Sequence, residues 1–222
     1  MRVIVTGSTG MVGKGVLIEC LEDSRVEKVL AINRSSLGIQ HPKLEELIVK
    51  EFIDIKNYTE NLKGYDACFH SMGVSSLGLN KMDYTKVTYD ITKALADTLY
   101  DLNSKMIFSY VSGQGTDSSE KGRLMWARVK GKTENYILNK GFKDAYAFRP
   151  GAIIPEKGVK SRTAWVNIFL VVFKPLFPIM KMSKNITTSS RIGQVMINIA
   201  LEPSTLKHLE GKDINQLATK AC

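Results

Sequence analysis

The sequence contains little of what would build a disulfide scaffold or a metal site. Its three cysteines, Cys20, Cys68 and Cys222, form no CxxC pair and no spacing typical of zinc ligands. We therefore expect no bound metal. Few cysteines and no apolar leader before the first predicted strand favour a reducing compartment, and we expect a cytoplasmic protein.

No apolar run is long enough to cross a bilayer. The most apolar stretch, residues 164–180, contains Asn167, Lys174 and two prolines, and its uninterrupted apolar part is only residues 168–173. A spanning helix needs about 18 such residues. We expect this stretch to cover a pocket or an oligomer interface, with peripheral membrane contact through the flanking lysines as the less favoured alternative.

Acidic residues are in the minority. The net charge is +9, from 31 basic and 22 acidic residues, but the basic residues are spread along the chain without a long run. No motif typical of nucleic-acid binding is present. We predict a solvated basic surface, part of it serving an anionic cofactor, and no nucleic-acid partner.

What the sequence does have is a glycine-punctuated turn at its start. Residues 6–13 read TGSTGMVG and directly follow the apolar residues 3–5. In a strand–turn–helix unit, Gly7 allows the tight turn, Gly10 lets the backbone approach a pyrophosphate, and Gly13 lets the helix pack closely. Amide groups at the helix N-terminus then bind the phosphates. The predicted cofactor-binding residues of this turn are Gly7, Ser8, Thr9, Gly10, Met11, Val12 and Gly13.

Strand and helix patterns alternate along the chain. Strands are predicted at residues 3–5, 29–32, 67–70, 106–111 and 145–148, and helices at 14–21, 81–103, 124–138 and 190–200. Residues 44–47 fit a short helix, whereas residues 46–49 could instead begin a third strand that ends before Asp54. This order predicts one α/β domain over residues 1–222: a Rossmann-like doubly wound parallel sheet with helices on both faces. Residues 151–189 are predicted to form a small lobe over the pocket.

The residues that follow the second strand predict which cofactor is bound. Units that bind NAD carry an acidic residue there for the ribose 2′-hydroxyl, whereas this chain has Asn33, Arg34 and Ser35. The planar guanidinium of Arg34 suits a 2′-phosphate, and Ser35 adds a hydroxyl. We predict NADP (NADPH) in preference to NAD; the alternative is that Arg34 is an ordinary surface residue.

Two further positions follow predicted strands and could meet the cofactor. Asp54 and Ile55 would face the adenine ring, and Met72 and Gly73 would let the backbone run close to the ribose. Both pairs also fit ordinary loop roles.

Motifs in the second half carry a family resemblance. Ser112 and Gly113 follow the fifth strand, the next helix contains WARVKGKTE at residues 126–134, and the sixth strand ends in FRPG at 148–151. With the TGxxGxxG turn, these segments resemble the atypical short-chain dehydrogenase/reductase family, in particular its epimerase/dehydratase-like branch that includes the Tat-interacting protein. The resemblance covers nearly the whole chain.

The resemblance implies a hydride-transfer site with one departure from the family pattern. Ser112 matches the serine that orients a substrate carbonyl, and Lys130 the lysine that holds the nicotinamide ribose and lowers the pKa of a tyrosine. Arg149 and Pro150, at the end of the sixth strand, are also assigned to the cofactor. The tyrosine position, one turn before Lys130, holds Trp126, whose role is doubtful: an indole N–H donates a hydrogen bond but is no general acid near neutral pH.

A literal YxxxK does occur later, at Tyr136 and Lys140. It lies at the end of the predicted helix, beside the expected C-cap Gly141 and far from the carboxyl ends of the strands, so we expect that it is not the catalytic pair. Tyr84 and Tyr110 are other phenols that no motif places, and His70 suits a structural role.

Two functional hypotheses remain. The first is an NADP-dependent oxidoreductase or epimerase/dehydratase with an atypical active site, which the retained Ser112 and Lys130 favour. The alternative is a non-catalytic NADPH-binding sensor or interaction protein, which Trp126 favours. We expect an unidentified small-molecule substrate for the first hypothesis, and a monomer or homodimer for either.

Overall fold

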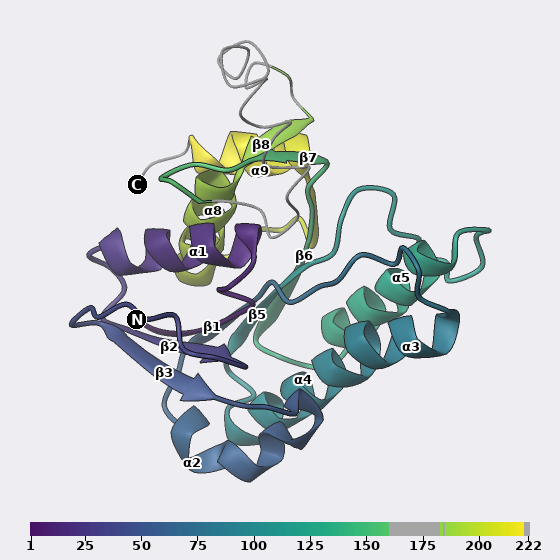
Figure 1. The fold of residues 1–222 in the computed structure, drawn as a ribbon. Coiled ribbons are helices and arrows are strands. Elements are labelled where there is room, and N and C mark those ends of the chain that lie inside the picture. The colour runs from purple at the N-terminus through teal and green to yellow at the C-terminus, as the bar shows by residue number, and fades with distance from the viewer. Residues whose placement is uncertain (160–182, 184, 220–222) are drawn as a thin grey trace.

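The centre of the protein is a seven-stranded parallel sheet with strand order β3-β2-β1-β4-β5-β6-β9 (Figure 1). It is seen in a computed structural model that describes residues 1–159, 183 and 185–219. The strands are β1 (Arg2–Thr6), β2 (Lys28–Asn33), β3 (Leu44–Ile48), β4 (Ala67–His70), β5 (Ile107–Val111), β6 (Asp144–Arg149) and β9 (His208–Glu210). This confirms the predicted Rossmann-like fold, and the order reverses between β1 and β4, where such sheets bind ligands.

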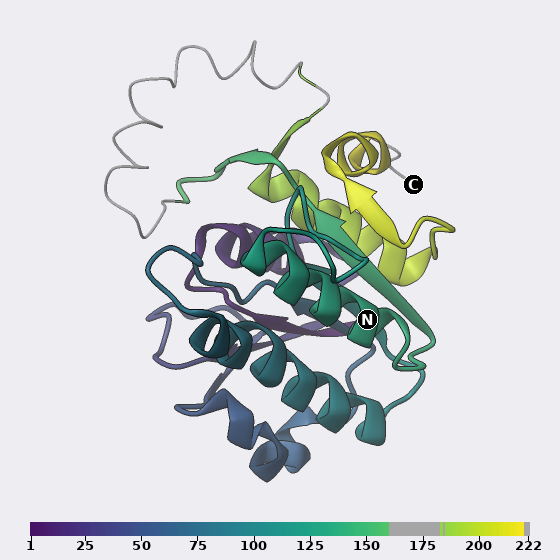
Figure 2. The same cartoon turned by 90° about the vertical axis from the view of Figure 1, so that its right-hand side faces the viewer.

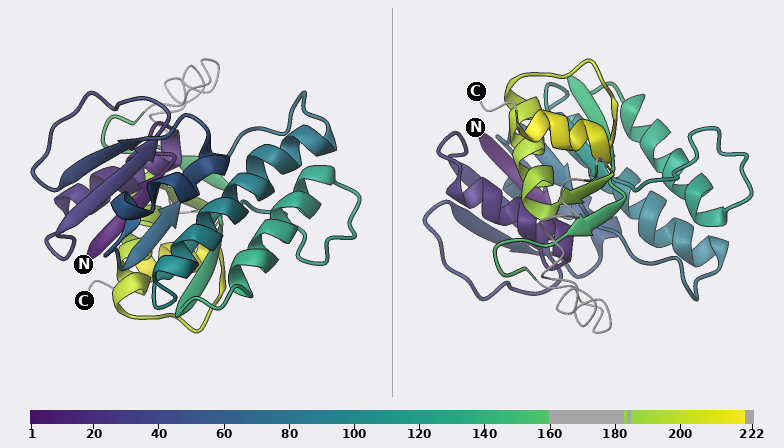
Figure 3. Two further views of the ribbon diagram at one scale, coloured as in Figure 1. Left: turned by 90° about the horizontal axis from the view of Figure 1, so that it is seen from below. Right: turned by 90° about the horizontal axis from the view of Figure 1, so that it is seen from above.

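Helices cover both faces of the sheet (Figures 1 and 3). One face carries α1 (Met11–Glu22), α8 (Ser189–Leu201) and α9 (Gly211–Ala218). The other carries η1 (Phe52–Tyr58), α2 (Thr59–Leu62), α3 (Lys81–Thr85), η2 (Lys86–Asp90), α4 (Ile91–Leu102) and α5 (Met125–Leu138). Each face has its own apolar core, so the central strands are buried on both sides, as in other parallel sheets.

Helices α1 and α8 pack at very short range because glycines lie where they cross. A β-carbon placed on Gly15 of α1 would come within 2.5 Å of Ser189 Cβ, and one on Gly193 of α8 would come within 2.8 Å of Glu19 Cγ. Val16 and Leu17 on α1 then fill the space against Ile192 in the shared core. This packing holds the start of α1, and the turn before it, against the sheet.

Residues 151–189 are only partly described. Strand β7 (Ala152–Ile154) continues from β6 and pairs in parallel with β8 (Ile186–Thr188), outside the main sheet (Figure 2). The stretch 164–180 lies outside the described residues, so its pocket-covering role stays a prediction.

The boundaries of several elements differ from the sequence prediction. Residues 44–48 form an edge strand and no helix, because they pair in register with β2. The predicted helix over 81–103 is continuous but contains the π-helical segment η2, and η1 was not predicted.

Candidate functional site

The turn between β1 and α1 adopts the conformation that its glycines allow. Gly7 has φ +72°, and a β-carbon there would lie 2.7 Å from the Ser71 carbonyl group. A β-carbon on Gly13 would lie 2.2 Å from Gly7 O, whereas a β-carbon on Gly10 would meet only Gly7 O, at 3.3 Å. Gly7 and Gly13 are therefore fixed by close packing inside the protein, and Gly10 is less confined.

The start of α1 is open to an anion. Its N-cap Gly10 supplies no side-chain hydrogen bond, and the first turn, which contains Met11, Val12 and Gly13, has no acidic residue. The amide groups and partial positive charge of such a helix N-terminus attract phosphate. Thr9, also in the turn, is half-buried.

Ser8 joins this turn to the end of β2. Its hydroxyl donates to Asn33 Oδ1 at 2.7 Å, and both side chains are buried. Among the residues that the structure describes, the amide nitrogen Asn33 Nδ2 has no hydrogen-bond partner. A buried donor without a partner costs free energy, so this position suits a polar ligand group beside the glycine turn.

Basic side chains follow β2 and β3 at the same edge of the sheet. Arg34 and Ser35 are exposed directly after β2. Lys50, which the sequence analysis missed, follows β3 and donates from Nζ to Arg34 O at 3.3 Å. Its position could have been found only by pairing β3 with β2, which brings Val49 N to Asn33 O at 2.8 Å.

Asp54 and Ile55 do not directly follow β3, as the prediction of a strand ending before Asp54 required. The strand ends at Ile48, and both residues lie in η1. The Ile55 side chain is fully buried in the apolar core, and Asp54 is exposed. The structure therefore places the Ile55 side chain among core residues and not at a ligand surface.

Met72 and Gly73 follow β4, separated from its last residue by Ser71. The preceding Ser71 donates from its hydroxyl to Thr6 O at 2.8 Å, which ties this loop to the end of β1. Met72 is half-buried, and a β-carbon on Gly73 would meet no atom within 4 Å. The structure brings these residues close to the glycine turn.

Ser112 and Lys130 are brought together at the carboxyl end of β5. Lys130 donates from Nζ to the main-chain oxygen of Ser112, and the Ser112 hydroxyl donates to Glu134. Burial lowers the pKa of Lys130 to about 8, against the opposing charge of Glu134. Glu134 lies one helical turn after Lys130 and is completely buried. The sequence analysis gave Glu134 no role, because no local pattern marks it.

Arg149 forms ion pairs with two carboxylates of its own chain. Its Nε donates to Glu134 Oε1 at 3.0 Å, and Nη1 lies 3.6 Å from Glu210 Oε1. These carboxylates raise the pKa of Arg149 further. Pro150 is buried, and its carbonyl accepts from Gln114 N at 2.9 Å. The Arg149 side chain therefore braces Glu134 in the structure, a role that the sequence analysis did not foresee.

Trp126 is half-buried one turn before Lys130. A β-carbon on Gly115 would lie 3.4 Å from its ring. Nearby phenols are poor acids: Tyr84 and Tyr110 are buried, and burial raises the pKa of each. Neither supplies an ordinary general acid.

His70 is held as a neutral structural side chain. It is buried between Thr6 Oγ1, 2.7 Å from Nδ1, and Thr92 Oγ1, 2.9 Å from Nε2. Burial lowers its pKa to about 3.

Tyr136 and Lys140 belong to a different cluster. Both donate to Asp97 of α4, which also accepts from Lys93. Among the described residues, neither forms a hydrogen bond to Ser112 or Lys130, and the expectation that this YxxxK is not the catalytic pair stays a prediction.

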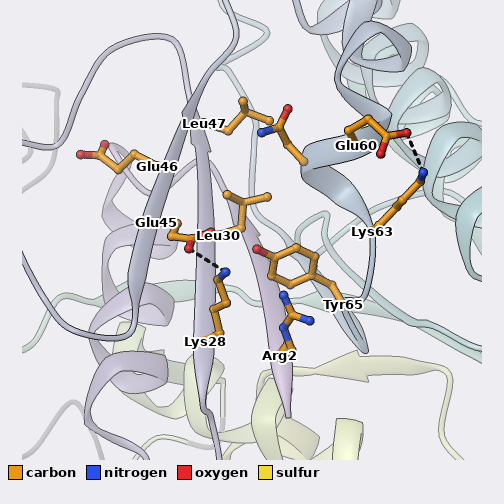
Figure 4. Close-up of a pocket in the computed structure, with 10 residues that line it drawn as sticks. Arg2, Lys28, Leu30, Glu45, Glu46, Leu47, Glu60, Lys63 and Tyr65 are labelled. Carbon is orange, nitrogen blue, oxygen red and sulfur yellow. Dashed lines mark hydrogen bonds and ion pairs between the residues drawn. The ribbon is translucent and has the colours of Figure 1, made fainter.

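A cavity of about 410 Å³ lies at a different place on the sheet (Figure 4). Arg2 and Lys28, at the starts of β1 and β2, line it together with Tyr65. Lys28 pairs with Glu45 at 2.6 Å, and Arg2 lies over the Tyr65 ring at 5.0 Å. It is distant from the predicted site, because ligands of such sheets bind at the opposite, carboxyl ends of the strands.

Metal-binding clusters and membrane-spanning helices are both absent from the described part of the chain. Within residues 1–159, 183 and 185–219, no three His, Cys, Asp or Glu side chains are grouped to hold a metal ion. In the same part of the chain, no helix is both long and apolar enough to span a membrane.

Comparison with known sequences gives distant relatives along almost the whole chain. No family model matches. The FMP52 protein of Eremothecium gossypii is 25% identical over 225 residues, covering 98% of this chain and 97% of the relative. The HTATIP2 protein of Rattus norvegicus is 24% identical over 166 residues, covering 74% of this chain and 67% of the relative. Both relatives belong to the atypical short-chain dehydrogenase/reductase branch.

The relatives contradict the prediction of a cytoplasmic location. FMP52 proteins of Meyerozyma guilliermondii, Debaryomyces hansenii, Eremothecium gossypii and Scheffersomyces stipitis are named as mitochondrial. The prediction was wrong because it rested on few cysteines and on the lack of an apolar leader. Neither feature argues against a mitochondrion, whose targeting segments are amphipathic and not apolar.

Solved structures share the fold at low sequence identity. The yeast methylglyoxal/isovaleraldehyde reductase Gre2, solved with NADPH, has a TM-score of 0.70 at 13% identity, covering 94% of this chain and 77% of that one. The Helicobacter pylori ADP-L-glycero-D-manno-heptose-6-epimerase has a TM-score of 0.69 at 14% identity, covering 94% and 75%. The Bordetella bronchiseptica enzyme WbmH, solved with NAD+, has a TM-score of 0.67 at 16% identity, covering 94% and 74%.

Fold and sequence relatives thus agree with the motifs, and the chain is similar to short-chain dehydrogenase/reductase proteins of the atypical, epimerase/dehydratase-related kind.

Proposed function

We propose that this protein binds NADP(H) across the carboxyl ends of β1, β2 and β4 and uses it as an oxidoreductase or epimerase/dehydratase. The observation that carries the proposal is the joined set of glycine turn, Ser8 and Asn33. The open N-terminus of α1 fits a pyrophosphate, and the unpartnered Asn33 Nδ2 supplies a buried donor beside it. Solved structures with this fold contain NADPH or NAD+.

The preference for NADP rests on the charges after β2 and β3. Arg34 provides a guanidinium where an acidic residue would bind the ribose of NAD, and Lys50 contacts the Arg34 carbonyl. Two cations at this edge favour an added 2′-phosphate, whereas an unmodified ribose gains little from them. Adenosine 2′,5′-bisphosphate carries the same 2′-phosphate as NADPH, and AMP lacks it, so the two nucleotides isolate the contribution of this group to binding.

Titration calorimetry with NADPH, NADH, adenosine 2′,5′-bisphosphate and AMP tests the cofactor assignment. We expect NADPH and the bisphosphate to bind about 10- to 100-fold more tightly than NADH and AMP, because a charged hydrogen bond contributes about 1.5–3 kcal/mol. Arg34→Ala and Lys50→Ala should remove most of this difference. Lys105→Ala, an exposed lysine before β5 at the opposite edge, is the charge-matched control. Equal affinity for NADPH and NADH would contradict the preference.

One observation favours a second candidate function, a cofactor sensor without turnover. Trp126 occupies the position from which the family's tyrosine gives its proton, and indole does not exchange one near neutral pH. Wild type and Trp126→Tyr should be compared on a panel of aldehydes and ketones with NADPH. Reduction by wild type supports the enzyme, whereas reduction by the Trp126→Tyr variant alone supports the sensor.

A further inference from the structure

The Ser112 hydroxyl is turned into the protein. Ser112 is 5% exposed, its O–H donates to Glu134, and its Oγ lies 3.1 Å from Phe148 O. A hydroxyl has one hydrogen to donate, and a carboxylate is the stronger acceptor of the two neighbours. Ser112 therefore has no hydrogen left for the oxygen of a substrate carbonyl.

The Lys130 ammonium group, beside Ser112, has more N–H donors than its bond to Ser112 uses. Its ammonium group carries three N–H bonds, of which one is directed to the Ser112 carbonyl. A β-carbon on Gly113 would lie 3.7 Å from Lys130 Nζ, so the missing side chain leaves this side of the amine uncovered. Gly113 has φ +148°, a conformation that other residues rarely adopt.

Glu134 fixes both groups. It is completely buried and accepts a hydrogen bond from the Ser112 hydroxyl. Arg149 Nε donates to Glu134 Oε1 at 3.0 Å. The main-chain oxygen of Ser112 accepts from Lys130 Nζ. Glu134 therefore holds Ser112, and Ser112 in turn holds the Lys130 amine in place. The Glu134 charge also favours the protonated amine, against the burial that disfavours it.

Other titratable groups on elements packed against α5 do not replace Glu134 in this role. Tyr110 on β5 and Tyr84 on α3 are buried phenols that stay neutral, because burial raises the pKa of each. Arg149 on β6 is paired with Glu134, and His208 Nε2 of β9 lies 3.7 Å from Glu134. On α4, Asp97 is taken up by Lys140 and Lys93.

We infer that Lys130 itself donates the proton to the substrate oxygen, with Glu134 as its positioning residue and Ser112 as the link between them. The inference rests on the proposed function, since a bound reduced nicotinamide dinucleotide supplies the hydride that reaches the carbonyl carbon. The Lys130 N–H bond breaks as the O–H bond of the product alcohol forms, and the neutral amine regains a proton from water. Hydride and proton together account for the two hydrogens gained by the carbonyl.

The amine of Lys130 can be observed without any turnover. NMR of the full chain labelled with 15N-lysine follows each Nζ as pH rises, and Lys130→Met assigns the signal. We expect a midpoint near pH 8 for Lys130. Lys140, which follows the same helix and is paired with Asp97, is the matched control and should titrate above an ordinary lysine, because Asp97 and Tyr136 raise its pKa. A Lys130 midpoint at or above that of Lys140 overturns the proposal.

The role of Glu134 is tested by removing its charge. Glu134→Gln should lower the Lys130 midpoint by about one pH unit or more, because the ammonium loses its neighbouring anion. Since this change leaves Arg149 without its partner, Glu134→Gln/Arg149→Met removes both charges and should shift the midpoint in the same direction. A midpoint that both variants leave unmoved overturns the positioning role.

Calorimetry with NADPH separates this inference from the proposed function. If wild type binds NADPH and Lys130 titrates like an ordinary lysine, the function stands and the inference fails. If the midpoint is near pH 8 but no form of the protein binds NADPH, the proposed function fails, and with it the source of hydride. With an active carbonyl substrate, kcat/KM should fall above the Lys130 midpoint in wild type and at lower pH in Glu134→Gln.

Discussion

The backbone of Gly7 lies against the backbone of Ser71, so that a β-carbon on Gly7 would be 2.7 Å from the Ser71 carbonyl group. The contact joins the loops after β1 and β4, the neighbouring strands at which the sheet order reverses. Because φ of Gly7 is +72°, a side chain here would also strain the backbone.

We predict that Gly7→Ala lowers the free energy of unfolding by about 2–4 kcal/mol, from crowding and from the left-handed backbone together. Urea unfolding followed by circular dichroism measures the change. Gly73→Ala is the control, because a β-carbon there meets no atom within 4 Å. Equal stability of the two variants would show that the contact with Ser71 relaxes at no cost.

Gly10→Ala should separate ligand binding from folding. Its β-carbon would meet only Gly7 O, at 3.3 Å, so we expect a loss of stability below about 1 kcal/mol. NADPH affinity should fall about tenfold or more, because the added methyl group lies where the backbone would approach a pyrophosphate. Titration calorimetry measures the NADPH affinity of wild type and variant under conditions in which both are equally folded. An unchanged affinity would mean that the phosphates bind elsewhere.

The buried amine of Lys130 predicts a dependence of stability on alkaline pH. Its pKa is about 8 in the folded protein and about 10.4 in an unfolded chain. Between these values the unfolded state binds more protons, so stability rises with pH. Lys130→Met should be more stable than wild type at pH 7, and the difference should shrink from pH 8 to 10.5. Parallel urea curves at all pH values would contradict this.

His70 predicts the complementary behaviour in acid. Its folded pKa of about 3 lies below the value of 6.5 in the unfolded chain. Stability is therefore lost as pH falls below 6.5, by about 1.4 kcal/mol per pH unit from this group. His70→Gln should show a shallower acid limb than wild type in urea unfolding at pH 4–7. The prediction is wrong if the two slopes agree.

The YxxxK pair of Tyr136 and Lys140 should not affect cofactor binding. Tyr136 and Lys140 share Asp97. We expect Tyr136→Phe to cost about 1 kcal/mol of stability through the lost hydrogen bond and to leave NADPH affinity within twofold of wild type. A tenfold loss of NADPH affinity would place Tyr136 in the site after all.

The sheet was predictable because its strands are apolar and bounded by glycine or polar turns. Residues 67–70 were predicted to the residue, whereas LEEL in residues 44–47 fits helix and strand equally and needed β2 to decide. Strands β7, β8 and β9 have three residues each, too short for a periodic pattern.

The site was less predictable than the fold, because its contacts join distant segments. Motifs identified Ser112 and Lys130 but not the direction of the Ser112 hydroxyl. Glu134 on α5, Arg149 on β6 and Glu210 on β9 come together only once these three elements pack. Lys50 similarly reaches Arg34 through the register of β3 on β2.

The packing of α1 against α8 has a consequence for the order of synthesis. The apolar side of α1, which ends at Glu22, is covered by a helix that begins at Ser189, so the 166 residues from 23 to 188 lie between the two elements. At about 5–20 residues per second, a ribosome needs roughly 8–33 seconds to make that length. During this interval Val16 and Leu17 lack their final neighbours on α8. The nascent N-terminal half therefore exposes an apolar surface of the kind that chaperones bind.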